Sequence, residues 1–171
     1  FNFITISAYY SHKNLDILNK IIPIMRLKKL KVHFYLTINQ KIFEKIFYNN
    51  SDFLTNLGPI DIKHVPSIYK QCDALFLPTL LETFTASYPE AMKMGKPIIT
   101  SDLSFAHAVC KDAALYFNPI NPKDVVDKIE SLITDSKLRG RLIEKGYNRL
   151  KHLETPKSRA GKYIKICEYH E

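Results

Sequence analysis

Residues 74–101, ALFLPTLLETFTASYPEAMKMGKPIITS, contain the pattern that decides the fold class. Its first five residues are almost entirely apolar, as is typical of a strand that is covered on both faces. Residues 97–101 at its other end form a second run of the same kind. Between the two runs, Pro89 lacks an N–H, which the first turn of a helix leaves unpaired anyway. We therefore predict a helix that begins near residues 86–88, and with it a strand–helix–strand unit.

Strand-like and helix-like segments alternate on both sides of this unit. The strands that we predict cover residues 3–7, 32–38, 55–58, 74–78, 97–101 and 114–117. Asn14 is expected to cap a helix, and further helices are expected at residues 42–47, 65–72, 122–135, 137–153 and 158–169. This order predicts one α/β domain over residues 1–171, with a doubly wound, mostly parallel six-stranded sheet and helices on both faces.

The composition excludes several classes of protein. No two of the five glycines are two residues apart and no Gly-Lys-Ser/Thr triplet occurs, so neither the dinucleotide fingerprint nor a P-loop is present. The three cysteines are widely spaced, which indicates free thiols in a reducing cytoplasm rather than a disulfide framework or a zinc site. No apolar run is long enough to span a bilayer. The chain starts at Phe1, inside an expected strand, so we predict that it is a piece of a longer protein.

The net charge of +8 is concentrated toward the end of the chain. Residues 135–171 hold ten Lys and Arg against five Asp and Glu. Such a tail is compatible with contact to an anionic membrane surface or to nucleic acid. The tyrosines among these charges recur at helical intervals, which favours a solvated helical face and no nucleic-acid partner.

Parallel sheets bind their ligands beyond the carboxyl ends of the strands, near the switch in strand order. That rule points to three loops, residues 8–13, 79–86 and 101–105. At the second loop, the free amides of the predicted helix start form a site for a phosphate or diphosphate. Glu82 and Glu90 would flank it, and Lys13 in the first loop would pair with phosphate oxygens. Taken singly, Glu90 would serve the helix dipole and Phe84 would belong to the core.

An ordered series of motifs in this sequence resembles the motifs of a known enzyme family. Residues 69–116 resemble the donor-binding half of retaining glycosyltransferases of family four, which have the GT-B fold. The matching segments are LPT (77–79), ETF (82–84), PEAM (89–92), GKPIITSD (95–102) and DAALYFNP (112–119). The similarity extends to KNL (13–15), LR (138–139) and Gly146, and so covers nearly the whole chain.

The resemblance implies a role for each matching residue. Glu82 would contact the donor sugar near the reacting carbon, and Lys13 would stabilise the leaving diphosphate, where charge grows as the glycosidic bond breaks. The residues that would bind the rest of the donor are Phe84, Thr85, Ala86 and Ser87 around the diphosphate, Glu90 at the ribose, and His12 as an additional donor to phosphate. The family generally needs no metal at the diphosphate, and the sequence contains no Asp-x-Asp.

Three positions depart from the family pattern. Thr83 and Thr85 stand where glycines commonly flank the motif phenylalanine, which narrows the backbone freedom of the loop. No arginine precedes Lys13 in its loop, so stabilisation of the leaving group would rest on Lys13 with help from His12. Ala108 stands where a glutamate is common.

These observations predict the donor-binding domain of a retaining glycosyltransferase that acts in polysaccharide or glycolipid synthesis. The donor would be a nucleoside-diphosphate sugar, with no further cofactor. The acceptor would bind to a missing N-terminal domain, so this piece would bind donor and transfer nothing. We expect it in the cytoplasm, with peripheral contact to the inner face of the membrane.

Alternative functions stay open at this stage. A nucleotide-sugar epimerase or phosphorylase would share the architecture. A non-enzymatic module could bind nucleic acid or membrane through the basic tail. A phosphoacceptor receiver domain is disfavoured because residues 7–10, SAYY, lack the acidic pair that such a domain needs after its first strand.

Overall fold

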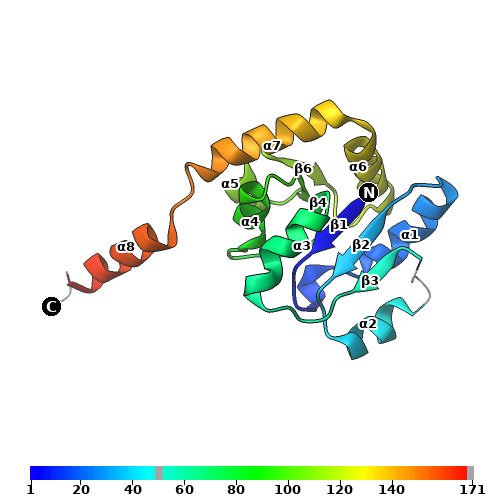
Figure 1. Ribbon diagram of the computed structural model, residues 1–171, viewed down its shortest axis with the longest axis horizontal. Coiled ribbons are helices and arrows are strands. Elements are labelled where there is room, and N and C mark those ends of the chain that lie inside the picture. The colour runs from blue at the N-terminus through cyan, green and yellow to red at the C-terminus, as the bar shows by residue number, and fades with distance from the viewer. Residues whose placement is uncertain (49–51, 169–171) are drawn as a thin grey trace.

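The computed structural model describes residues 1–48 and 52–168, and in them strands alternate with helices (Figure 1). The strands are β1 (Asn2–Thr5), β2 (His33–Leu36), β3 (Leu54–Asn56), β4 (Ala74–Leu77), β5 (Ile98–Ser101) and β6 (Ala114–Phe117). The α-helices are α1 (Ile17–Leu27), α2 (Gln40–Phe47), α3 (Val65–Gln71), α4 (Ser87–Lys93), α5 (Ser104–Cys110), α6 (Pro122–Thr134), α7 (Ser136–Leu150) and α8 (Pro156–Glu168). Short 3₁₀ helices occupy Ser11–Lys13 (η1) and Ile62–His64 (η2).

The sheet confirms the predicted fold class. Its strand order is β3-β2-β1-β4-β5-β6, and every neighbouring pair runs parallel. From β1 the chain adds β2 and then β3 toward one edge of the sheet. Strand β4 then pairs with the other side of β1, and β5 and β6 follow toward the opposite edge. Phe3 of β1 therefore pairs with Phe34 of β2 on one side and with Ala74 of β4 on the other. This reversal of direction places the loops after β1 and β4 next to each other at the carboxyl edge of the sheet.

Each face of the sheet has its own hydrophobic core. Phe3, Phe34 and Phe76 point to one face, where they pack against residues of α1 and α6. Because side chains alternate along a strand, Ile4 and Leu75 point to the other face and pack against α3 and α4. All four residues of β4 are buried, which explains the continuous apolar run of residues 74–77 in the sequence.

Two glycines allow α7 to approach α4 closely. Gly95 has a φ of +63°, and a Cβ at this position would overlap the hydroxyl of Tyr147 on α7. Gly146 on α7 lies against Met92, whose Cγ would be 3.4 Å from an added Cβ. This contact fixes α4, which carries Glu90, against the body of the domain.

The structure corrects several details of the sequence interpretation, among them the first strand, which ends at Thr5 rather than at residue 7, and the helix predicted at residues 137–153, which ends at Leu150. Asn14 does not cap the start of α1: this helix begins at Ile17 after Asp16, and Asn14 instead ends η1 in a left-handed conformation with a φ of 53°. The third strand ends at Asn56 rather than at residue 58, because Gly58 turns the chain with a φ of 72°. The last helix begins at Pro156 rather than at residue 158, and Tyr169, the predicted end, lies outside the described residues.

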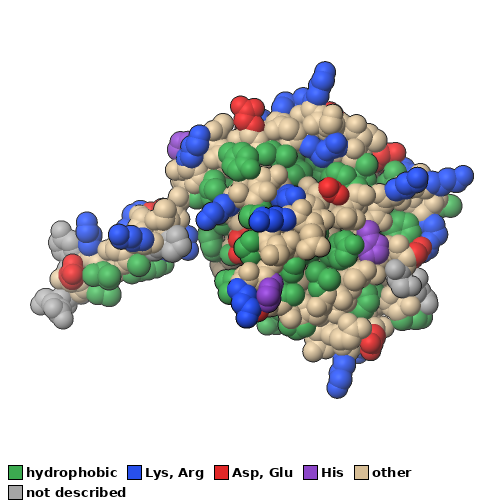
Figure 2. Space-filling view, in the orientation of Figure 1, with side chains coloured by type: hydrophobic (Ala, Val, Ile, Leu, Met, Phe, Trp, Pro, Cys, Tyr) green, Lys and Arg blue, Asp and Glu red, His purple; other side chains and the backbone are tan. Residues whose placement is uncertain are grey.

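The last helix, α8, extends away from the body of the domain (Figure 1). Lys and Arg side chains project from it (Figure 2). The large apolar side chains that are exposed on α8 are Tyr163, Ile164 and Ile166. Among residues 1–48 and 52–168, no helix combines the length and the apolar character needed to cross a membrane.

Candidate functional site

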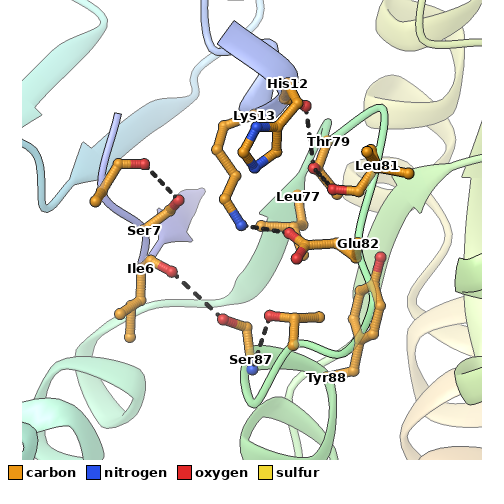
Figure 3. Close-up of polar contacts among 12 residues, drawn as sticks. Ile6, Ser7, His12, Lys13, Leu77, Thr79, Leu81, Glu82, Ser87 and Tyr88 are labelled. Atoms are coloured by element: carbon orange, nitrogen blue, oxygen red, sulfur yellow. Dashed lines mark hydrogen bonds and ion pairs between the residues drawn. The ribbon is translucent and has the colours of Figure 1, made fainter. Parts of the chain in front are cut away.

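Two loops meet at the carboxyl edge of the sheet, one after β1 and the other after β4 (Figure 3). The N–H of Leu80 donates to the carbonyl of His12 at 2.7 Å. The buried hydroxyl of Thr79 lies 3.1 Å from the carbonyl oxygens of His12 and Leu81. These contacts hold the first loop against the second across a sequence separation of 67 residues.

An ion pair between Lys13 and Glu82 joins the two loops at the centre of the site (Figure 3). It links the Lys13 ammonium to the Oε1 oxygen of Glu82. The side chains are only 16% and 10% exposed, respectively. Because both charges are largely removed from water, each depends on the other for compensation. The sequence interpretation placed these two residues at one site, and the structure brings them into direct contact.

The first turn of α4 forms another part of the site. Helix α4 begins at Ser87, which confirms the helix start predicted near residues 86–88. The Thr85 hydroxyl accepts a hydrogen bond from the N–H of Ser87 at 3.3 Å. The Ser87 hydroxyl donates to the carbonyl of Ile6, just beyond β1, at 3.4 Å (Figure 3). Glu90 follows Ser87 by three residues and so lies on the same side of the helix.

A pocket of about 370 Å³ opens between these elements. Seven of the eight site residues predicted from the sequence line it, namely Lys13, Glu82, Phe84, Thr85, Ala86, Ser87 and Glu90. Its other lining residues are aliphatic: Ile6, Ile60, Ile62 and Val65. The pocket therefore combines convergent polar groups with apolar walls, and such concave sites are typical of small-molecule binding. A neighbouring cavity of about 410 Å³ shares Ile6 and Ile60 with this pocket.

His12 and the third predicted loop lie outside this lining. The ring of His12 stacks on Tyr10 with the centroids 5.6 Å apart, and its carbonyl holds the loop after β4. Residues 102 and 103 of the third loop line a separate pocket with Leu80 and Ile120. The structure therefore assembles the site from two of the three predicted loops.

Glu90 is half-buried, and a tyrosine that the sequence did not point to lies beside it. Burial raises the pKa of the Glu90 carboxyl, and a hydrogen bond from Tyr69 opposes that rise. Tyr69 is fully buried on α3, and its hydroxyl also lies 3.3 Å from the Ser87 carbonyl. In the sequence Tyr69 carries only the signal of an apolar helix face, so its proximity to Glu90 could be found only from the fold.

Phe84 is not a core residue, contrary to what its position alone suggests. It is 47% exposed, and the guanidinium of Arg159 lies 4.5 Å from the centroid of its ring. Such cation–π contacts contribute about 0.5–1 kcal/mol at exposed sites. Arg159 comes from α8, so the tail brings a cation to the rim of the pocket, although the sequence shows no arginine near Lys13.

Metal ligands do not gather in the described part of the chain. Within residues 1–48 and 52–168, no group of three or more His, Cys, Asp or Glu side chains could hold a metal ion. The charged residues in the lining of the pocket are Lys13, Glu82 and Glu90.

The fold is that of the domains from which GT-B glycosyltransferases are built. One such structure is S. aureus TarM in complex with Fondaparinux, alpha-GlcNAc-glycerol and UDP. It matches 96% of this chain and 35% of its own with a TM-score of 0.83 and 16% sequence identity. Residues 2–149 match the family model Glycosyl transferases group 1, and the chain belongs to that family.

Two relatives by sequence are also glycosyltransferases. An uncharacterized glycosyltransferase of Methanocaldococcus jannaschii, MJ1178, is 29% identical over 147 residues, which are 82% of this chain and 40% of that protein. The O-antigen chain mannosyltransferase RfbU of Salmonella typhimurium is 31% identical over 81 residues, which are 47% of this chain and 23% of that protein. The chain thus spans less than half the length of either relative.

Proposed function

We propose that this chain is the nucleotide-sugar-binding domain of a retaining glycosyltransferase of family four. The proposal depends on the pocket between the loops after β1 and β4, which Lys13, Glu82 and Glu90 line together with the first turn of α4. One cation and two carboxylates in a pocket with polar and aliphatic walls suit a ligand that has phosphates at its centre and hydroxyls on both sides.

The proposed roles follow from the position of each group. The pyrophosphate lies beside Lys13 and the amides of residues 85–87. Glu82 accepts hydrogen bonds from hydroxyls of the donor sugar, and Glu90 accepts them from the ribose. When the glycosidic bond breaks, negative charge grows on the leaving phosphate oxygen, and the Lys13 ammonium stabilises it.

Donor binding requires an exchange of partners at two points of the pocket. Lys13 and Glu82 now neutralise each other, so the incoming phosphates replace Glu82 as the partner of Lys13. Glu82 is thereby released to the sugar. In the same way, a phosphate oxygen that takes the Ser87 amide displaces the Thr85 hydroxyl, which is its present partner.

The rest of the enzyme belongs to the proposal as well. The chain covers 40% or less of the two relatives, which supports a whole enzyme that is longer than this chain. In our proposal its acceptor binds to an N-terminal domain. The name of RfbU, an O-antigen chain mannosyltransferase, supports an acceptor of glycan or glycolipid type. The proposed location is the cytoplasm, with peripheral contact to the anionic inner face of the membrane, and the net charge of +8 supports that contact.

Isothermal titration calorimetry with UDP and GDP tests the site. Lys13→Met and Glu90→Gln are each expected to weaken nucleoside-diphosphate binding about tenfold or more, since each removes a charge-assisted hydrogen bond. Lys20→Met, which removes the same charge from an exposed position on α1, is the control and should leave the affinity unchanged. Unchanged binding in both site variants would refute the assignment.

A second experiment distinguishes transfer from other chemistry on the same architecture. NMR of a nucleotide sugar incubated with this chain is expected to show line broadening from binding, with the sugar unchanged. Inversion at a sugar carbon would identify a nucleotide-sugar epimerase instead. In a parallel incubation with an oligosaccharide and inorganic phosphate, release of a sugar phosphate would identify a phosphorylase.

A further inference from the structure

Asn14, the residue that follows Lys13, ties together three loops at the carboxyl edge of the sheet. Its side-chain Nδ2 donates to the carbonyl of Pro78 at 3.1 Å and to the carbonyl of Pro119 at 3.1 Å. Pro78 directly follows β4, and Pro119 lies two residues after β6. These acceptors are 64 and 105 residues away in the sequence. Both groups accept, so the NH₂ end of the amide must face them, and its two hydrogens are both used.

The backbone of Asn14 is held as firmly as its side chain. Its N–H donates to the carbonyl of Ser11 at 3.1 Å, and its carbonyl accepts from the N–H of Ile17 at 3.2 Å. Its left-handed conformation, with a φ of 53° and a ψ of 31°, ends η1 and redirects the chain into α1. Asparagine tolerates this region better than most residues. Few other residues combine this backbone conformation with two side-chain donors.

This arrangement constrains the position of the Lys13 side chain. The Lys13 backbone is fixed on one side by the bond from its N–H to the Tyr10 carbonyl at 2.9 Å, and on the other by Asn14. Asn14 is anchored to Pro78, four residues before Glu82, in the loop that also carries the acid partner of Lys13. The bonds of Asn14 thus act together with those of the His12 carbonyl to set the distance between the loop that provides the cation and the loop that provides the acid.

We propose that Asn14 is a positioning residue, which sets the Lys13 ammonium against Glu82 in the free protein and against the donor pyrophosphate when ligand is bound. The second half of this proposal rests on the proposed function, whereas the first half does not. Asn14 acts through Lys13 and does not itself contact the donor.

The first test needs no ligand. Asn14→Gly removes the amide and permits the left-handed conformation, and Lys13→Met removes the ammonium. We expect Lys13→Met to lower the Tm by about 6 °C in the native background and by about 2 °C or less in the Asn14→Gly background, since a displaced Lys13 has little pairing left to lose. Lys29→Gly is the matched control, because Lys29 is also left-handed, with a φ of 54°. In that background the full effect of Lys13→Met should persist.

The second test measures the affinity for UDP in the same variants. Asn14→Gly is expected to weaken UDP binding about fivefold in the native background, and less than twofold when Lys13→Met is already present. A merely structural role for Asn14 would weaken UDP binding equally in both backgrounds. Asn14→Ser, which retains one donor, replaces Asn14→Gly if the latter does not fold, and its effects should be in the same direction and smaller.

The outcomes separate the two proposals. Absence of binding to any nucleoside diphosphate by the native protein would refute the proposed function, while the Tm cycle still decides the role of Asn14. Equal Tm losses from Lys13→Met in the native and Asn14→Gly backgrounds would overturn the positioning role, as would equal losses of UDP affinity in the two Lys13 backgrounds.

Discussion

The ion pair between Lys13 and Glu82 predicts a measurable coupling between two distant parts of the chain. Removal of one member of a fully buried pair costs about 3–5 kcal/mol, because the other charge is left without compensation. Here the side chains are 16% and 10% exposed, so residual solvation lowers the expected cost of Lys13→Met or Glu82→Leu to about 2–3 kcal/mol each. The double variant leaves no stranded charge, and its cost should be about 1 kcal/mol.

Urea unfolding of the native protein, both single variants and the double variant measures this coupling. The exposed pair between Arg26 and Asp52 is the matched control, with a distance of 2.8 Å and side chains 50% and 53% exposed. Its cycle should give less than about 1 kcal/mol and should weaken with salt, whereas the Lys13–Glu82 cycle should change little with salt. If the cost of the double variant equals the sum of the two single costs, the reasoning about a desolvated pair is refuted.

Three further predictions follow from the same structure. Gly95→Ala should lower the free energy of unfolding in urea by about 2 kcal/mol, because the backbone there is left-handed and the new Cβ would clash with Tyr147. When Tyr147→Leu removes the clashing hydroxyl, the cost should be about half as large, and a cost that Tyr147→Leu does not change would contradict the predicted clash. Burial raises the pKa of the Glu90 carboxyl above its ordinary value of 4.5, so the native state holds this proton more tightly than the unfolded chain does. The free energy of unfolding should therefore fall as pH rises from 4.5 through the raised native pKa, and Glu90→Gln should remove that fall. A thiol reagent should modify the exposed Cys167 rapidly in the native protein. Cys72 and Cys110 are buried, which raises their pKa to about 11 and about 12, so they should react only on unfolding. Rapid modification of a second thiol would count against this burial.

The fold could be predicted from the sequence because its central strands are buried on both faces. The apolar run of β4 and the β-branched run of β5 have no polar alternation that would suggest another assignment. The helix start at Ser87 was predicted for a local reason as well, since Pro89 favours the first turn. A local sequence signal of this kind predicts the structure correctly when no contact with a distant part of the chain overrides it.

Asn14 shows why other details could not be predicted in the same way. Its sequence position suggested a helix cap, which is a local role. In the fold its side chain instead bonds two carbonyls that lie 64 and 105 residues away, and no periodicity encodes those distances. The proximity of Tyr69 to Glu90 and the contact of Arg159 with Phe84 have the same origin.

The reversal of strand order also divides the pocket between two parts of the polypeptide. Lys13 comes from the part that builds β1, β2 and β3, whereas Glu82 and Glu90 come from the part that builds β4, β5 and β6. Neither part alone holds both the cation and the acids. Two fragments of this protein that reassociate along the β1–β4 boundary are therefore expected to show the proposed nucleotide affinity only on assembly, which makes that boundary a suitable place to divide the domain into a split reporter.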